Sequence, residues 1–320
     1  MTRMTLMAAR KGAPIEIALV NNMPDQALEA TVAQFSGLVR MGAEGLSANL
    51  RLYNLPSARR GETARRILAQ THDPIDGLYA RGTDALIVTG AEPRAPDLSD
   101  ESYWEEFAQL VAWARANTFG ALWSCLAAHG AVLALDGLAR RREAEKISGV
   151  YACAVMQGDW ATQGMAPLLN MPHSRYNGLA REDLERFGYN ISSWSAEVGV
   201  DSFWRREPSL FLFTQGHPEY DAQTLSREFR RDALRYINAQ SQTFPPTPKN
   251  YFSPMAERGI ADLKKTADQS QRMRFSKGLN ALMAQEKLQA VWRRDAEQLY
   301  RNFLSQVAFE KATRSRSTAL

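Results

Sequence analysis

The sequence predicts an α/β fold: a mostly parallel sheet covered by helices on both faces, with a helical extension at the C-terminus. Short apolar runs at 15–20, 85–88 and 120–124 each end in turn-forming or small residues, and helical patterns separate them. Strands that alternate with helices at this spacing are typical of parallel sheets. The 320 residues are 45% hydrophobic and 23% charged, which excludes a wholly disordered chain and allows a large core.

The first half of the chain repeats this unit in order. The strand at 15–20 runs into the turn-forming Asn21-Asn22-Met23-Pro24, and a helical pattern follows it. Strands at 47–53 and 85–88, an amphipathic helix at 101–117 and a strand at 120–124 come next. Because sites in such sheets lie at the carboxyl ends of the strands, we expect the loops at Asn22, Gly90 and Cys125 to meet at one edge.

The second half is less regular. It predicts strands at 146–155 and 209–214 and a helix at 224–240, and the proline-rich stretch at 245–248 marks a boundary. The expected organisation is an N-terminal arm at 1–14, a main domain at 15–244, a helical extension at 245–310 and a flexible tail at 311–320.

Composition excludes several classes of protein. Two cysteines cannot build a disulfide framework or a four-thiolate zinc site, and no run approaches the roughly 18 apolar residues of a membrane span. The 39 basic and 35 acidic residues leave a net charge of only +4, and the basic residues are scattered rather than clustered. We therefore expect a cytoplasmic protein that binds small molecules, and neither nucleic acid nor a membrane.

Two short segments carry candidate chemistry. Cys125 follows a buried-type strand and precedes a helix-compatible run, so it can be a nucleophile at a strand-to-helix turn whose free N–H groups hold an oxyanion. His217-Pro218-Glu219 follows another strand and offers a base with an orienting carboxylate. Each has a plainer alternative, a core cysteine and a structural histidine respectively.

Longer motifs point to one family. The chain resembles the homoserine O-acyltransferases of methionine biosynthesis that are built on the class I glutamine amidotransferase fold, and the resemblance spans most of its length. It rests on Leu19-Val20-Asn21-Asn22-Met23-Pro24, Ile87-Val88-Thr89-Gly90-Ala91, Tyr103-Trp104, Trp123-Ser124-Cys125, Glu145-Lys146-Ile147-Ser148-Gly149-Val150-Tyr151, Pro172-His173-Ser174-Arg175, Gly216-His217-Pro218-Glu219-Tyr220-Asp221, Thr224-Leu225, Arg231-Asp232, Asn250-Tyr251-Phe252 and Trp292-Arg293.

The resemblance implies a role for each matching residue. Cys125 accepts the acyl group as a thioester, His217 accepts a proton and Glu219 is its partner. The implied substrate-binding residues are Lys146, Ser174 and Arg231, and the implied oxyanion donors are the backbone N–H groups of Leu126, Gly90 and Ala91.

The implied reaction is ping-pong, with acyl-coenzyme A as co-substrate, no bound cofactor and no metal. A homodimer is a further expectation, for which Leu288, Val291 and Trp292 offer an apolar helix face.

Departures from the family pattern leave the substrates open. Arg94 stands where acetyl-transferring members have Glu and succinyl-transferring members have Gly, and its charge favours a succinyl over an acetyl group. His129 replaces a Gln near the nucleophile, either to fill the core or to tune the thiol, and Asp25-Gln26 stands where a Lys is usual. The favoured acceptor is L-homoserine. The alternatives are another amino alcohol such as serine, a glutamine amidotransferase-type hydrolase, and a binding protein that has lost turnover.

Overall fold

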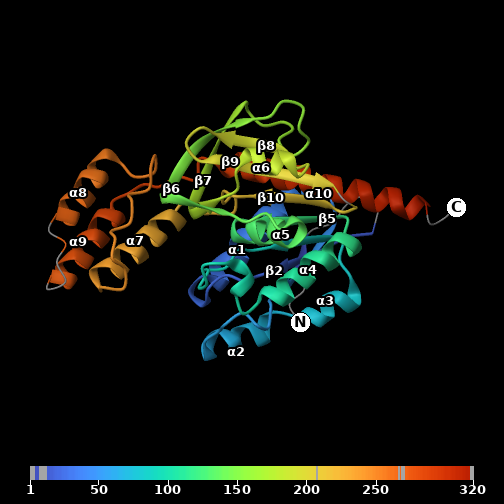
Figure 1. Cartoon of the computed structure of the whole chain (residues 1–320), viewed down its shortest axis with the longest axis horizontal. Coiled ribbons are helices and arrows are strands. Elements are labelled where there is room, and N and C mark those ends of the chain that lie inside the picture. The colour runs from blue at the N-terminus through green and yellow to red at the C-terminus, as the bar shows by residue number, and fades with distance from the viewer. Residues whose placement is uncertain (1–3, 7–12, 207, 266, 268–270, 318–320) are drawn as a thin grey trace.

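The structure is a computed structural model that describes residues 4–6, 13–206, 208–265, 267 and 271–317 (Figure 1). Within these residues, ten strands form one sheet in the order β1-β3-β2-β4-β5-β10-β9-β8-β6-β7. The strands are β1 Met4–Leu6, β2 Ile15–Val20, β3 Ala48–Tyr53, β4 Ala85–Val88, β5 Gly120–Ser124, β6 Arg141–Val155, β7 Leu168–Gly178, β8 Asn190–Ser195, β9 Gly199–Arg206 and β10 Leu210–Thr214.

The helices lie on both faces of this sheet or beside it (Figure 1). They are α1 Leu28–Gly42, α2 Glu62–Thr71, α3 Ile75–Arg81, α4 Trp104–Asn117, α5 Leu126–Asp136, α6 Arg181–Arg186, α7 Thr224–Ile237, α8 Pro254–Lys265, α9 Arg272–Ala284 and α10 Arg293–Ser317, with short 3-10 turns η1 Asp25–Ala27 and η2 Leu98–Asp100.

The middle of the sheet is parallel. Strands β3, β2, β4, β5 and β10 run in the same direction, and every residue of β4, β5 and β10 is buried, as expected for strands covered on both faces. The predicted α/β fold class is confirmed. Beyond β10 the sheet continues through the antiparallel strands β9, β8, β6 and β7, of which the sequence predicted only one.

Two apolar cores lie on opposite faces of the sheet. On one face α3, α4 and α5 cover residues such as Leu86, Trp123 and Phe213. On the other face α1 and α10 cover the alternating residues, such as Ile87 and Leu122. Since successive side chains of a strand point to opposite faces, the same five strands supply both cores.

The C-terminal third is organised differently from the expected single extension. Helices α8 and α9 pack on α7 around Phe252, Ile260 and Phe275, at one end of the molecule (Figure 1). Helix α10 instead returns to the sheet, where it packs on α1 and β5. Trp292, just before it, is fully buried and donates its indole N–H to the carbonyl of Tyr220 at 2.9 Å, so it cannot belong to an exposed dimer face.

Both ends of the chain also differ from the expected arm and tail. Met4–Leu6 pairs antiparallel with β3, whereas residues 1–3 and 7–12 of the expected arm lie outside the described residues. Helix α10 continues to Ser317 through most of the expected tail, and 318–320 lie outside the described residues. Lys311 donates to Asp84 Oδ2 at 2.6 Å, which attaches this part of the helix to the sheet. Among the helices described, none combines the length and the apolar character that a membrane span requires.

Candidate active site

Cys125 occupies a strained turn between β5 and α5. Its φ of 50° and ψ of −108° lie in a region that non-glycine residues rarely adopt. The turn is held because the Cys125 N–H donates to the carbonyl of Thr214 at 2.7 Å, and its carbonyl accepts from the N–H of His129 at 3.2 Å. The thiol is therefore partly exposed at the edge of the sheet, next to the N-terminus of a helix.

His217 and Glu219 lie in the loop after β10 and form a buried pair. The distance from His217 Nδ1 to Glu219 Oε1 is 2.8 Å, and both residues are less than 10% exposed. The His217 N–H donates to the carbonyl of Pro172 at 2.8 Å, and the ring stacks on Tyr220 at 4.2 Å between centroids. Strand register explains why this pair meets the thiol: Thr214, at the end of β10, is the direct partner of Ser124, at the end of β5.

The electrostatics of this pair favour a charged imidazole. Burial alone would lower the pKa of His217, but the charges of Cys125 and Glu219, together with the contact to Glu219, raise it well above its usual value. The imidazolium can then stand beside a thiolate. The ends of β5 and β10 thus bring together a thiol, an imidazole and a carboxylate, the groups that cysteine-dependent acyl transfer uses.

The backbone around Gly90 is close to this nucleophile. A Cβ added at Gly90 would come within 3.2 Å of the Leu126 nitrogen and 3.4 Å of the Ser124 carbonyl, so a side chain here would crowd the start of α5. In the part of the chain that the structure describes, the N–H groups of Gly90, Ala91 and Leu126 have no hydrogen-bond acceptor. They are available to an oxyanion formed on a group bound to Cys125.

Lys146 and Arg231 meet at one carboxylate. Lys146 Nζ is 2.7 Å from Asp232 Oδ2, and Arg231 Nε is 2.8 Å from Asp232 Oδ1. Burial would raise the pKa of Asp232, but the hydrogen bond from Arg231 and the charge of Lys146 outweigh it and lower the pKa. Ser174 lies on β7, opposite Ser148 of β6, and lines the same cavity as Cys125.

Glu228 is a candidate that the sequence interpretation missed. It lies one helical turn before Arg231 on α7, and its Oε1 accepts the hydroxyl of Tyr220 at 3.0 Å. Its Oε2 is buried and has no hydrogen-bond partner among the described residues. Tyr220 also stacks on His217, so it contacts both the Glu228 carboxylate and the His217 imidazole. The sequence offered one indication of this candidate: Glu228 is three residues before Arg231 in a predicted helix, so the two side chains share a helix face.

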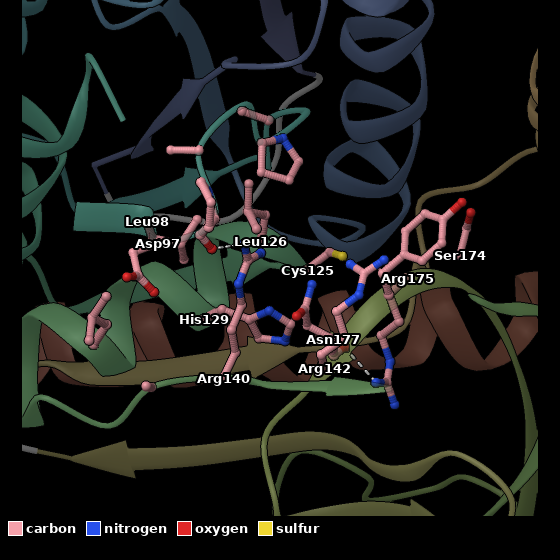
Figure 2. Close-up of a pocket in the computed structure, with 17 residues that line it drawn as sticks. Asp97, Leu98, Cys125, Leu126, His129, Arg140, Arg142, Ser174, Arg175 and Asn177 are labelled. Carbon is pink, nitrogen blue, oxygen red and sulfur yellow. Dashed lines mark hydrogen bonds between the residues drawn. The ribbon is translucent and has the colours of Figure 1, made fainter. Parts of the chain in front are cut away.

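A cavity of about 600 Å³ opens beside the thiol (Figure 2). Its lining contains Cys125, Leu126 and Ser174, together with three arginines of the β6–β7 region, Arg140, Arg142 and Arg175.

Arg94 is not among the lining residues, which corrects its expected place beside the acyl group. Its side chain is exposed and lines a neighbouring hollow with Arg59 and Arg60, and its backbone N–H is held by Glu101.

His129 is buried beneath the cavity as a neutral group. It is 2% exposed, and because the amide oxygen of Gln215 accepts at 2.9 Å, its Nε2 is the donor. Burial lowers its pKa to about 3, with the hydrogen bond to Gln215 acting in the opposite direction. Of the two expected roles, filling the core therefore fits the structure.

Cys153, His173 and Asp201 form a second buried cluster, with their potential ligand atoms within 4.8 Å of one another. Arg175 Nε donates toward His173 Nδ1 at 3.4 Å, which places the ring proton on Nε2, 3.2 Å from Asp201 Oδ1. Burial also raises the pKa of the Cys153 thiol far above its usual value. Within this cluster, His173 and Asp201 form a buried histidine–carboxylate pair next to Cys153.

The family model and the curated relatives that match this chain name one family. The model of the homoserine O-succinyltransferase family matches residues 2–314. A homoserine O-succinyltransferase of Bradyrhizobium japonicum is 48% identical over 250 residues, covering 78% of this chain and 77% of that protein. One from Rhodopseudomonas palustris is 40% identical over 296 residues, 92% and 89% of the two chains. Among solved structures, a glutamine amidotransferase of Thermotoga maritima matches with a TM-score of 0.47 and 11% identity, over 92% of this chain and 99% of that one.

Proposed function

Because this chain belongs to the homoserine O-succinyltransferase family, we propose that it transfers a succinyl group from succinyl-coenzyme A to the side-chain hydroxyl of L-homoserine. The observation that carries the proposal is the position of Cys125. Cys125 lines a cavity, sits on a turn of positive φ, and follows the strand next to the one that leads to the paired His217 and Glu219. This arrangement suits a covalent acyl intermediate.

In the first half of the proposed reaction, the Cys125 thiolate attacks the thioester carbonyl of the donor. The N–H groups of Gly90, Ala91 and Leu126 stabilise the oxyanion, each contributing on the order of 3 kcal/mol. The carbon–sulfur bond to coenzyme A then breaks, and the His217 imidazolium protonates the departing thiolate. The enzyme is left with an acylated cysteine and a neutral imidazole.

In the second half, the neutral His217 removes the proton of the homoserine hydroxyl as the oxygen attacks the Cys125 thioester. The Cys125 thiolate leaves, the O-acyl ester is released, and the thiolate–imidazolium pair is restored. The loss of the thiolate charge on acylation is what changes His217 from an acid into a base, because that charge is one of the two that raise its pKa.

The acceptor's zwitterion matches two side chains of α7. Arg231 is partly exposed and suits the carboxylate, and the unpartnered Oε2 of Glu228 suits the ammonium group. Glu228 and Arg231 are three residues apart on α7, so their side chains leave the same face of the helix. Lys146 and Ser174 supply further polar contacts on the side of the reacting hydroxyl.

A matrix of two donors and two acceptors tests the proposal. Acetyl- and succinyl-coenzyme A are each incubated with L-homoserine and L-serine, with release of free coenzyme A as the readout. We expect succinyl-coenzyme A with homoserine to give the highest kcat/KM. Glutamine is included as a control, and steady glutamate release without coenzyme A turnover would identify a hydrolase instead.

Replacing Arg231 by glutamine should affect the acceptor alone. We expect the KM for homoserine to rise about 10- to 100-fold, because one charge-assisted contact to its carboxylate is lost, while acylation of Cys125 by the donor is unchanged. Arg230→Gln is the matched control, since that neighbour is exposed and its Nε donates to Asn280. Steady-state kinetics with both substrates varied would measure this. A loss of donor acylation would contradict a role of Arg231 that is confined to the acceptor.

A further inference from the structure

Three consecutive arginines lie where β6 begins: Arg140 directly precedes the strand, and Arg141 and Arg142 are its first two residues. Successive side chains of an extended chain point in opposite directions, and these three follow that rule. Arg141 faces away from the cavity and pairs with Glu182 at 3.0 Å and with Asp183. Arg140 and Arg142 both line the cavity that contains Cys125. The alternation therefore delivers two cations to the site and one to the protein surface.

The two cavity-facing guanidinium groups have weak ties to the protein. Arg140 has one long hydrogen bond, to the carbonyl of Pro96 at 3.4 Å. Arg142 makes no hydrogen bond or ion pair to the described residues and stacks over the ring of Tyr176, 4.9 Å from its centroid. In Figure 2, the side chains of Arg140 and Arg142 both extend toward the part of the cavity where the Cys125 thiol lies. Their donors remain available to a ligand.

Arg175, the third arginine of the cavity lining, is already used by the fold. It donates to the carbonyl of Asn177 at 2.7 Å, to the carbonyl of Val198 and toward His173 Nδ1, and its side chain is 3% exposed. Figure 2 shows its guanidinium turned away from Cys125. Among the cavity's arginines, this leaves Arg140 and Arg142 as the cations with donors to offer.

We propose that Arg140 and Arg142 bind the distal carboxylate of the succinyl group while that group is attached to Cys125. This inference rests on the proposed function and assigns the acyl-selecting role that Arg94 cannot perform from outside the cavity. A guanidinium presents paired N–H donors that match the two oxygens of a carboxylate. Arg140 lines the same cavity as Cys125, so its guanidinium can reach a group attached to that thiol. The one acidic residue in the described lining is Asp97, an exposed side chain.

The same cations could in principle serve the phosphates of coenzyme A, and the two sources of negative charge predict different kinetics. If the arginines bind the acyl carboxylate, replacing them lowers kcat/KM for succinyl-coenzyme A and not for acetyl-coenzyme A, since the acetyl group has no carboxylate. If they bind the phosphates, replacing them lowers kcat/KM for both donors equally, because both contain the same coenzyme A. The ratio of the two kcat/KM values separates these cases independently of overall activity.

The experiment compares Arg140→Gln, Arg142→Gln and the double variant with the unmodified protein, using both donors and homoserine. We expect kcat/KM for succinyl-coenzyme A to fall about 10- to 100-fold in each single variant, with the value for acetyl-coenzyme A changed less than about threefold. Arg141→Gln is the matched control and should behave as the unmodified protein. Formation of the Cys125 adduct, followed by intact mass, gives the same comparison without the acceptor.

The outcomes distinguish this inference from the proposed function. If the unmodified protein uses neither donor, the proposed function fails. Suppose instead that the unmodified protein uses succinyl-coenzyme A. If kcat/KM then falls equally for both donors in both single variants, or falls for neither donor, the carboxylate subsite is overturned and the proposed function stands. A thermal unfolding midpoint close to that of the unmodified protein confirms that a variant is folded, and Arg140→Lys or Arg142→Lys should restore part of the succinyl preference.

Discussion

Replacement of Cys125 by alanine is expected to abolish acyl transfer, with kcat reduced at least about 10⁴-fold and no covalent adduct formed with succinyl-coenzyme A. The reason is that no other thiol is placed to react. Cys153 is fully buried, and burial raises its pKa far above its usual value. Intact mass measured after mixing with the donor reports the adduct directly, and the unmodified chain should gain one succinyl group.

The matched control is Cys153→Ala, which should still form the adduct, because that side chain is fully buried and does not line the cavity of Cys125. If Cys125→Ala retains an adduct of the same mass, then Cys125 is not the nucleophile. Alanine keeps the Cβ and the backbone hydrogen bonds of the turn, so a folding defect is not expected.

Replacement of His217 by asparagine is expected to lower kcat about 10²- to 10⁴-fold, the range associated with loss of a positioned acid–base group. Two half-reactions report different roles of the residue. Acylation of Cys125 loses the imidazolium that stabilises the thiolate, and transfer to homoserine loses the base. Single-turnover measurements of each half, with His72→Asn as a control remote from the cavity, separate the two effects.

The pH dependence follows from the charges around His217. In the free enzyme, Cys125 and Glu219 together outweigh burial and raise the pKa of His217. In the acyl-enzyme the Cys125 charge is absent, so burial is opposed by Glu219 alone and the pKa must fall. Transfer from the acyl-enzyme to homoserine should therefore remain active at pH values where His217 of the free enzyme is still protonated. An NMR titration of His217 before and after alkylation of Cys125 checks this: an unchanged pKa would contradict the proposed switch.

Local sequence determined the elements that carry the candidate site residues, because each is a short strand followed by its own turn. Apolar runs at 120–124 and 209–214 specify buried strands, so Cys125 and His217 fall just beyond strand ends whatever the rest of the chain does. Parallel pairing then brings those ends to one edge of the sheet. The long sequence motifs were sufficient to identify the family, and the family model that matches residues 2–314 confirms it.

Only the tertiary structure decided what surrounds these residues. Nothing local to Arg94 indicates that its loop points it away from the cavity, and nothing local to Arg140 and Arg142 indicates that β6 runs past the thiol. That path depends on the antiparallel pairing of β6 with β7 and β8, which joins segments far apart in the chain. The sequence of helix α10 likewise predicts a charged surface helix, yet the helix packs on one face of the sheet. It does so because α1 and the strands leave an apolar surface there that α10 buries. Contacts between distant segments cannot be read from a periodicity, which reports only which face of its own element a residue occupies.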